Sequence, residues 1–233
     1  MPSTLLLIPT YNERDNVSLI AEKILALNLE LDVLFIDDNS PDGTGEVLDQ
    51  LAAEHSCINV LHRSEKGGLG NAYREGFAYS LERGNTYTIC MDADLSHNPS
   101  DLSRFLKSLE EADLVSGSRY LKDGGILYWP FRRKLLSRGA ALYTRLITRM
   151  PLTDPTGGFN AYRNEMLAAL PLSEMTSNGY SFQIEMKHLA WSGGYRVKEI
   201  PIIFTERRSG KSKMSPGIIH EAVWLVWKIL LKR

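Results

Sequence analysis

The chain has 233 residues, of which 43% are hydrophobic and 24% are charged, and its formal net charge is −1. These values fit one large globular domain, with or without an appendage, and exclude a disordered or fibrous chain. The two cysteines, Cys57 and Cys90, have no motif spacing, which excludes a disulfide framework and indicates a reducing compartment. No basic start, long apolar stretch or cleavage site follows Met1, so we expect no secretory signal.

The first 118 residues alternate short apolar runs with segments of helical periodicity. The apolar runs, each predicted to be a strand, are 4–8, 33–36, 58–61, 86–91 and 113–118. Between them, apolar residues recur at helical spacing within 17–27, 69–77 and 102–109. This alternation predicts an α/β fold with a mainly parallel sheet covered by helices on both faces.

Acidic loops follow three of these predicted strands. They read PTYNE at 9–13, DDNSPDG at 37–43 and DADLSH at 92–97. Ligands of parallel sheets bind beyond the carboxyl ends of the strands, and these ends meet at one edge. We therefore expect the three loops to converge on one rim and to bind a ligand there.

Asp92 and Asp94 stand two residues apart at a strand end, so their carboxylates are expected to project to the same side. Two carboxylates this close repel unless a counter-charge is present. Mg²⁺ and Mn²⁺ prefer oxygen ligands and bridge to ligand phosphates. A solvated turn that caps a helix over 99–111 is the alternative, but two further acidic loops favour the metal. His97 is expected to make a structural hydrogen bond.

The segment DDNSPDGT at 37–44 has some features of a calcium-binding loop. A strand precedes it, however, and the twelfth position counted from Asp38 is Asp49 rather than glutamate, so we reject that interpretation. The aspartates are instead expected to accept hydrogen bonds from a ribose or a base edge. A helix cap formed by Asp42 or Thr44 is the alternative.

The segment KGGLGN at 66–71 is not a dinucleotide-binding fingerprint. Such a fingerprint follows the first strand, and the first strand here is followed by a loop without glycine. We interpret the segment as a flexible turn that brings Lys66 near a phosphate.

Basic residues accumulate after residue 118, where the regular alternation stops. Between 119 and 149, eight lysines and arginines stand against one acid, Asp123. A helix is predicted over about 132–149, with basic residues on one side and apolar residues on the other. Arg133 and Ser137 share a lateral strip of this helix, where both can contact one ligand.

The rest of the chain has a turn at 154–158, predicted helices near 165–170 and 181–192, and a predicted strand over 197–204. The loop RRSGKSK at 207–213 carries four cations and is interpreted as closing over a pyrophosphate, with a solvated loop as the alternative. Without interleaved aromatic residues or a basic net charge, it does not predict nucleic-acid binding. The apolar tail, 216–233, is too short and too charged to span about 30 Å of hydrocarbon, and its apolar face can dock on the core, a partner or a bilayer surface.

Eight motifs, in this order, resemble the family 2, GT-A-type glycosyltransferases, and within them the polyprenol-phosphate (dolichol-phosphate) mannose synthases. They are PTYNE, IDDNSPDGT, KGGLGNA, DADLSH, GSRY, WPFRRKLLS, DPTGGF and FTERRSGKSK. The resemblance covers nearly the whole chain. It implies a GT-A-type, Rossmann-like catalytic domain over 1–215 and C-terminal amphipathic interface helices, with the amphipathic tail over 216–233.

The activity implied by the resemblance is inverting transfer of mannose from GDP-mannose to a polyprenyl (dolichyl or undecaprenyl) phosphate, with Mg²⁺ or Mn²⁺ as cofactor. The implied location is peripheral, at the cytoplasmic face of a membrane. Many relatives append transmembrane helices. This chain, which has only the tail, resembles the compact form that sits on a membrane surface or uses an anchoring protein partner.

The resemblance also implies roles for individual residues. The nucleoside pocket is expected to be lined by Pro9, Tyr11, Glu13, Ile36 and Asp38. The rest of the donor is expected to contact Lys66, Asp92, Ala93, Asp94, Arg207 and Lys213, the last two as a phosphate clamp. The expected metal ligands are Asp94, Asp92 and Ser96. The acceptor phosphate is expected to bind Arg119, Arg133 and Ser137. Catalytic roles fall to Asp94, Arg119, Arg133 and Asp154, with Asp154 as the candidate general base.

Two departures from the family pattern and two alternatives remain. Ser96 replaces a glutamine common in these synthases, and GGFN replaces SGFR in the turn that follows Asp154.

One alternative function keeps the fold and transfers glucose from UDP-glucose to polyprenyl phosphate. The other is a non-catalytic sugar-nucleotide-binding subunit, which has no use for residues that bind an acceptor phosphate.

Overall fold

Seven strands form the central sheet of the structure, a computed structural model that describes residues 2–175, 177, 179–206 and 226–228. Their order is β3-β2-β1-β4-β7-β5-β8. The strands are β1 (Thr4–Thr10), β2 (Asp32–Asp37), β3 (Ile58–His62), β4 (Tyr87–Cys90), β5 (Leu114–Ser118), β7 (Asn160–Arg163) and β8 (Val197–Pro201). Neighbouring strands are parallel except at β7, which runs antiparallel to both β4 and β5.

Helices cover both faces of the sheet because alternate residues of its strands point to opposite sides. On β1, Leu6 and Ile8 face the layer formed by α1 (Arg14–Leu25), α2 (Thr44–Glu54) and α4 (Leu102–Ser108), which follows the 3₁₀ turn η1 (Pro99–Asp101). Leu5 and Leu7 face the layer formed by α3 (Leu69–Glu82), α6 (Asn164–Ala169) and α7 (Gly179–Ser192), with the 3₁₀ turn η2 (Leu172–Glu174) between α6 and α7. The predicted α/β class, mainly parallel with helices on both faces, is confirmed.

The predicted strand over 197–204 is wrong in one respect, because it is two strands. Pro201, which has no N–H to donate, ends β8. The chain then forms β9 (Ile203–Phe204), which pairs with β6 (Gly125–Ile126) in a separate two-stranded sheet. Strand β7 was not predicted, since its four residues are too few for a clear apolar alternation. It fills the gap between β4 and β5.

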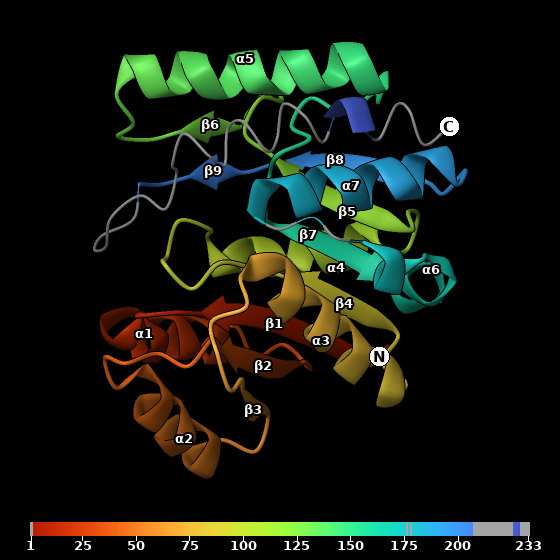
Figure 1. Cartoon of the computed structure of the whole chain (residues 1–233). Coiled ribbons are helices and arrows are strands. Elements are labelled where there is room, and N and C mark those ends of the chain that lie inside the picture. The colour runs from red at the N-terminus through yellow and green to blue at the C-terminus, as the bar shows by residue number, and fades with distance from the viewer. Residues whose placement is uncertain (1, 176, 178, 207–225, 229–233) are drawn as a thin grey trace.

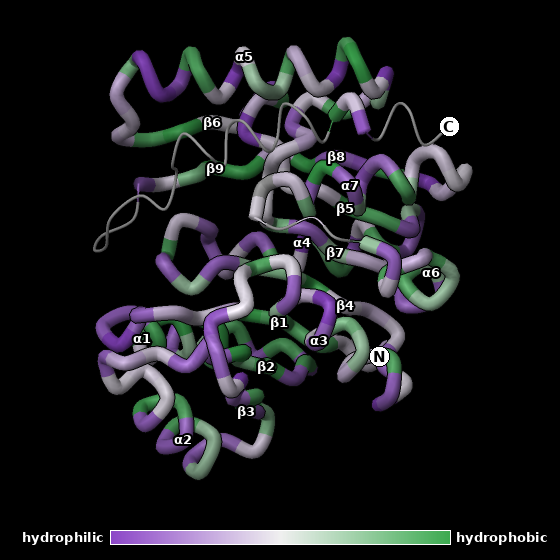
Figure 2. Tube along the Cα trace, viewed as in Figure 1, coloured by the Kyte–Doolittle hydropathy of each residue, from purple (hydrophilic) through white to green (hydrophobic). Residues whose placement is uncertain are grey.

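Helix α5 (Phe131–Thr148) lies at the edge of the molecule, beside β6 and β9, and α2 lies at the opposite end (Figure 1). Hydrophobic and hydrophilic residues alternate along it (Figure 2). Its buried residues are Ala141, Thr144 and Thr148. Four large apolar residues on one side of the helix are exposed, namely Phe131 (78%), Leu135 (62%), Leu142 (54%) and Leu146 (70%). We call these four residues the apolar stripe.

The predicted tail, 216–233, lies outside the described residues apart from 226–228. Val226 is buried and packs with Met150, Leu152 and Ile184. In the described part of the chain, no helix has the length and hydropathy needed to cross a bilayer.

Candidate active site

The three acidic loops leave the same edge of the sheet. Strands β2, β1 and β4 are neighbours and parallel, with Thr10 in register with Asp37 and Leu7 with Cys90. The ladder continues into the loops, because the Asp38 N–H donates to the Thr10 carbonyl at 3.0 Å. This is the convergence on one rim that the strand pattern predicts, and we call the three loops the acidic rim.

Hydrogen bonds join the first two loops of the acidic rim. The Glu13 N–H donates to Thr44 Oγ1 (3.0 Å) and the Asn12 N–H to Ser40 Oγ (3.0 Å). Asp42 accepts from the Thr44 N–H (3.0 Å) and hydroxyl (2.6 Å). Burial raises the pKa of Asp42, but these hydrogen bonds outweigh it and lower the pKa overall. Asp42 therefore shapes the loop, but the capping alternative is wrong, because the N-cap of α2 is Gly43, which has no side-chain capping hydrogen bond.

Asp38 is buried and its carboxylate is held in place from α3 and β3. It pairs with Arg63, the residue after β3, and accepts the N–H of Gly68 at 3.1 Å, just before α3. Arg63 also pairs with Glu75 at 3.0 Å. Burial lowers the pKa of Arg63, but the hydrogen bonds to Glu75 and Asp38 raise it overall. The Asp38 carboxylate, which is predicted to contact the base, is thus held in one orientation by Arg63 and the Gly68 N–H.

Of the other residues predicted to line the nucleoside pocket, three lie at the acidic rim and one is buried in the core. Pro9, Tyr11 and Glu13 are partly exposed at the acidic rim. The Lys66 ammonium lies over the Tyr11 ring, 3.7 Å from its centroid, which brings the predicted phosphate contact to this rim. Ile36 is fully buried and belongs to the core under α3, so its side chain does not line the rim.

The third loop carries the predicted metal ligands. Asp94 and Ser96 are buried, and Asp94 Oδ1 accepts the Ser96 N–H at 3.1 Å. Leu95 has a φ of 60°, which turns the chain sharply between them. The Asp92 side chain is 36% exposed. Ser96 Oγ is buried without a hydrogen-bond partner among the described residues, as expected of an atom that contacts a ligand.

His97 has the structural role predicted for it. Its Nδ1 accepts the Asp92 N–H at 3.2 Å, and its ring stacks on Phe159 with centroids 4.9 Å apart. A nitrogen that accepts this hydrogen bond is not available to a metal. His97 therefore fixes the backbone of the acidic loop.

These side chains fit a hard divalent cation that is shared with a substrate. Among the described residues, no group of three or more His, Cys, Asp or Glu side chains can hold a metal by itself. Mg²⁺, however, is commonly bound through one or two carboxylates together with substrate phosphates and water. Asp92 and Asp94, with the unpartnered Ser96 hydroxyl, supply that incomplete set of oxygen ligands.

Arg119 and Asp154 form a buried ion pair across 35 residues of sequence. Nε and Nη2 of Arg119 donate to the two carboxylate oxygens at 2.6 and 2.8 Å, and the Arg119 N–H donates to Oδ2 at 3.1 Å. Burial raises the pKa of Asp154, but the charge and hydrogen bonds of Arg119 lower it overall. The prediction of Asp154 as a general base is wrong, because a fully buried carboxylate with a low pKa and both oxygens engaged is a poor proton acceptor.

Aromatic side chains surround the predicted acceptor residues. The Arg133 guanidinium lies over Trp129, 3.8 Å from the ring centroid, and pairs with Glu206 at 2.7 Å. The Tyr120 hydroxyl donates to Ser137 Oγ at 2.6 Å. We call the set of Arg119, Tyr120, Trp129, Arg133, Ser137 and Phe204 the basic–aromatic cluster. It brings Arg119, Arg133 and Ser137 together, as the resemblance implies.

The basic–aromatic cluster adjoins the acidic rim. The Thr205 N–H donates to the Ser96 carbonyl at 3.0 Å, and Phe204 packs edge-on against His97, with centroids 5.5 Å apart. Phe204 also contacts Trp129 edge-on, with centroids 5.4 Å apart. The carboxylates of the acidic rim and the arginines of the basic–aromatic cluster therefore lie on either side of the Ser96–Thr205 hydrogen bond. Arg207 and Lys213, the predicted donor clamp, lie outside the described residues.

Sequence comparison identifies the family. The model of glycosyl transferase family 2 matches residues 6–170. This chain is a family 2 glycosyltransferase. It is 45% identical to the polyprenol monophosphomannose synthase of Mycolicibacterium smegmatis, over 96% of this chain and 85% of that protein. It is 46% identical to the undecaprenyl-phosphate mannosyltransferase of Micrococcus luteus, over 94% of this chain and 90% of that protein.

Solved structures agree with the fold. The mannosyltransferase PcManGT of Pyrobaculum calidifontis, in complex with GDP-Man and Mn²⁺, superposes with a TM-score of 0.61 at 18% identity, covering 99% of this chain and 72% of that one. The Mycobacterium tuberculosis glucosyl-3-phosphoglycerate synthase, in complex with Mn²⁺, UDP and phosphoglyceric acid, gives 0.68 at 17% identity, covering 99% and 78%. The predicted GT-A-type fold is confirmed.

Several residues of the glycosyltransferase site were not predicted. Arg63, Trp129 and Glu206 hold predicted residues in place but belong to no pattern that assigns them a role. Lys187 is fully buried on α7, where its ammonium donates to the carbonyls of Asp154 (3.1 Å) and Gly157 (2.8 Å). The signal for Lys187 was present in the sequence, since it stands three residues from both Ile184 and Ala190, on the apolar side of the predicted helix.

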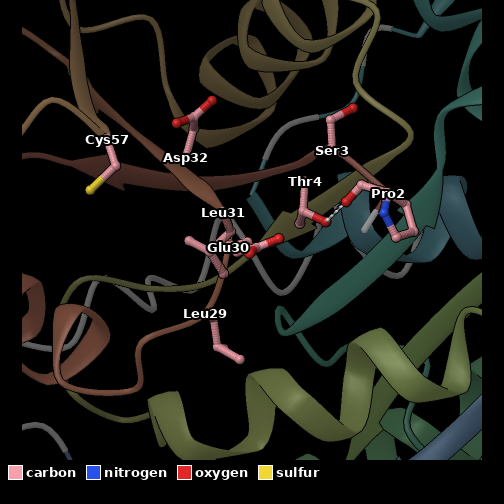
Figure 3. A pocket seen from close by; sticks show the side chains of 8 residues that line it. All are labelled: Pro2, Ser3, Thr4, Leu29, Glu30, Leu31, Asp32 and Cys57. Carbon is pink, nitrogen blue, oxygen red and sulfur yellow. Dashed lines mark hydrogen bonds between the residues drawn. The ribbon is translucent and has the colours of Figure 1, made fainter.

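Figure 3 shows a recess of about 430 Å³ at the other end of the sheet. It is lined by the start of β1, the segment before β2 with the first residue of that strand, and the residue before β3, namely Pro2, Ser3, Thr4, Leu29, Glu30, Leu31, Asp32 and Cys57. The amino ends of β1 and β2 lie here, away from the carboxyl ends that carry the acidic rim. The recess is therefore separate from the glycosyltransferase site.

Proposed function

We propose that this glycosyltransferase transfers mannose from GDP-mannose to a polyprenyl phosphate, with inversion at the anomeric carbon. The observation that carries the proposal is the meeting of two oppositely charged groups of residues at the Ser96–Thr205 hydrogen bond. The acidic rim is suited to a metal-bound diphosphate, and the basic–aromatic cluster is suited to the phosphate of an acceptor. The mannosyl and polyprenyl specificity is supported by the two relatives at 45 and 46% identity.

On the donor side, we assign the nucleoside to Pro9, Tyr11, Glu13 and the fixed carboxylate of Asp38, and the sugar diphosphate to Lys66, Asp92 and Asp94. The Ala93 side chain, like that of Ile36, is buried in the core and is not assigned a contact. Asp92, Asp94 and Ser96 are the residues that would hold Mg²⁺ or Mn²⁺. A bound divalent ion neutralises the negative charge that develops on the leaving diphosphate. Arg207 and Lys213 remain the proposed partners of the same phosphates.

On the acceptor side, the nucleophile is a phosphate oxygen that is already anionic at neutral pH. It needs positioning rather than deprotonation, so a general base is not required. Arg133 and Ser137 are partly exposed and suited to contact the phosphate, because Trp129 and Tyr120 hold them from the side. Arg119, locked by Asp154, supplies a fixed positive charge beneath them.

The apolar stripe is suited to binding at a membrane surface, where the lipid acceptor resides. Arg138 and Arg145, and Arg149 just after the helix, are exposed together with its leucines. The predicted separation of basic and apolar residues onto opposite sides of this helix is therefore wrong. Leucines and phenylalanine inserted at the headgroup boundary, with flanking arginines near anionic lipids, are typical of peripheral helices. The stripe supports a peripheral location at a membrane surface, and we propose the cytoplasmic face because the family resemblance implies it.

A donor-exchange assay tests the proposed function. The purified chain is incubated with Mn²⁺, a polyprenyl phosphate and either labelled GDP-mannose or labelled UDP-glucose. We expect label in the organic phase only from GDP-mannose. Label from UDP-glucose alone would overturn the mannose assignment, and label from neither donor would favour a non-catalytic subunit.

A further inference from the structure

Lys187 is a buried cation that the proposed reaction does not use. It lies on the inner side of α7 with no exposed surface. Its ammonium donates to two main-chain carbonyls, those of Asp154 (3.1 Å) and Gly157 (2.8 Å). Among the described residues, no carboxylate forms an ion pair with this ammonium. The positive charge is thus directed at the backbone of one turn, 154–157.

This turn is held by charged groups from three elements. Glu199, on β8, accepts the N–H groups of Thr153 (2.6 Å) and Asp154 (2.8 Å). Lys187, on α7, donates hydrogen bonds to the main-chain carbonyls of Asp154 and Gly157. Arg119, which follows β5, forms an ion pair with the Asp154 carboxylate. Each charged group meets backbone or side-chain atoms of opposite polarity, so electrostatic contacts from three elements help to fix the position of the turn.

Stability alone does not account for a lysine at this position. Burial lowers the pKa of Lys187 to about 8, although the charges of Asp154 and Glu199 act to raise it, and Arg119 lowers it further. Keeping the ammonium charged in the core therefore costs free energy. A methionine of similar length would avoid that cost. Both carbonyls would keep another donor, since the Asn160 side chain donates to the Gly157 carbonyl (3.0 Å) and the Gly157 N–H to that of Asp154 (3.4 Å).

The turn touches both sides of the active site. Its Asp154 carboxylate fixes Arg119 in the basic–aromatic cluster. At its other end, a Cβ on Gly158 would lie 3.7 Å from the Asp92 carboxylate and from His97. Gly157 packs so closely on β5 that a Cβ there would come within 2.8 Å of the Gly117 carbonyl. A shift of the turn would therefore displace Arg119 relative to Asp92.

We propose that Lys187 is a positioning residue, whose ammonium holds the 154–157 turn so that Arg119 faces the acceptor phosphate at a fixed distance from the acidic rim. The inference deepens the proposed function and rests on it for the role of Arg119. The contacts themselves do not depend on the identity of donor or acceptor.

The test compares Lys187→Met with Lys198→Met in the full chain. Lys198 is an exposed lysine on β8 that pairs with Glu111, so its replacement removes the same charge at the surface. For Lys187→Met, we expect kcat/KM for polyprenyl phosphate to fall by about 10-fold to 100-fold, because small misplacements of positioning groups have effects of this size. We expect the affinity for GDP with Mn²⁺ to change less than about twofold and the melting temperature to stay equal or rise. Lys198→Met should leave all three unchanged.

Amide hydrogen exchange provides a readout that does not depend on activity. In Lys187→Met, we expect faster exchange in 153–158 and at the Arg119 N–H, and unchanged exchange in α1 and α2. Unchanged exchange in the turn, or an unaltered kcat/KM for the acceptor in an active enzyme, would overturn the inference. A lower melting temperature with parallel losses of GDP affinity and turnover would also overturn it, since that pattern describes a core residue.

The wild-type protein gives an independent measurement if the variant does not fold. Because the pKa of Lys187 is about 8, acceptor kcat/KM should decline as the pH rises through that value, while GDP binding stays constant. An acceptor kcat/KM that is constant from pH 7 to pH 9 would contradict the proposal. Failure of both labelled donors in the donor-exchange assay would instead reject the proposed function, and the exchange experiment would still decide the role of Lys187.

Discussion

The acidic rim and the basic–aromatic cluster are built in different ways. In the acidic rim, each carboxylate follows a strand within a few residues, and side-chain hydrogen bonds within turns, such as Asp42–Thr44 and Asp94–Ser96, join residues two apart. In the basic–aromatic cluster, the decisive pairs join distant segments, with 35 residues between Arg119 and Asp154 and 73 between Arg133 and Glu206. Turns within single loops shape the first region, and contacts such as Glu13–Thr44 and Asp38–Arg63 then join its loops to other segments. The second region is held mainly by ion pairs between distant segments. Substitutions in the two regions should therefore have different effects on donor binding, acceptor binding and stability.

The largest effect is expected at the acidic rim, from Asp94→Asn. The substitution keeps the shape of the side chain but removes half of the carboxylate charge that Asp92 and Asp94 offer to a cation. We expect transfer to fall by about 10²-fold or more, with a sharp loss of metal-dependent GDP binding. Steady-state assays and titration of GDP with and without Mn²⁺ measure the two effects. Asp101→Asn is the control, since Asp101 pairs with Arg104 outside the rim; equal losses in both variants would contradict the prediction.

In the basic–aromatic cluster, Asp154→Asn should act on stability as well as on activity. It leaves the Arg119 guanidinium buried without its counter-charge, and breaking a buried pair in this way typically costs about 3 to 5 kcal/mol. Urea denaturation measures the free energy of unfolding. Glu111→Gln, which breaks a surface pair with Lys198, should leave it unchanged. A stable Asp154→Asn variant would show that the pair does not hold this region together.

The Arg119–Asp154 ion pair should also make the free energy of unfolding depend on pH in the acidic range. The pKa of Asp154 is lowered in the folded protein from an ordinary value of 3.8, so its contribution is complete above that value and is lost as the pH falls through the lower folded pKa. We expect the free energy of unfolding to decline below about pH 4, with a shallower slope in Asp154→Asn. Denaturation curves between pH 2.5 and 6 measure both slopes. Some slope should remain, because Asp42 and Asp113 also have lowered pKa values; identical slopes in both proteins would be evidence against the pair.

A smaller effect is expected from Arg133→Ala, which removes the partly exposed cation of the cluster. Loss of one charged hydrogen bond to the acceptor phosphate should raise the KM for polyprenyl phosphate by about tenfold. The KM for GDP-mannose should not change. Arg132→Ala, at the neighbouring exposed position, is the matched control. A rise in the donor KM instead would move Arg133 to the donor side.

The smallest effect is expected at the apolar stripe. Leu146 is 70% exposed, and Leu146→Ser should weaken binding to anionic vesicles several-fold, since burying one leucine side chain contributes about 1.5–3 kcal/mol at most. Co-sedimentation measures the bound fraction. Ala140→Ser, at an exposed position on another side of α5, should bind as the wild type does. Equal binding of Leu146→Ser and wild type would show that α5 does not contact the bilayer.

The contrast between the two regions also explains what the sequence could predict. Strand periodicity and the residues after each strand were enough for the parallel sheet, the acidic rim and the structural role of His97, because these depend on neighbours in sequence. Asp154 was misinterpreted as a base because its partner, Arg119, reaches it only in the folded chain. The role of Lys187 was missed for the same reason, since its two acceptors are backbone carbonyls more than 29 residues away. The outward side of α5 likewise depends on which elements cover the helix.

The most direct test of the division between donor and acceptor sides is to measure two affinities in two variants. GDP with Mn²⁺ and a short-chain polyprenyl phosphate are each titrated into Asp94→Asn and Arg133→Ala. We expect Asp94→Asn to lose GDP binding and keep the lipid phosphate, and Arg133→Ala to do the reverse. If either variant lost both affinities together, or if the two losses were exchanged, the assignment of the acidic rim to the donor and of the basic–aromatic cluster to the acceptor would be contradicted.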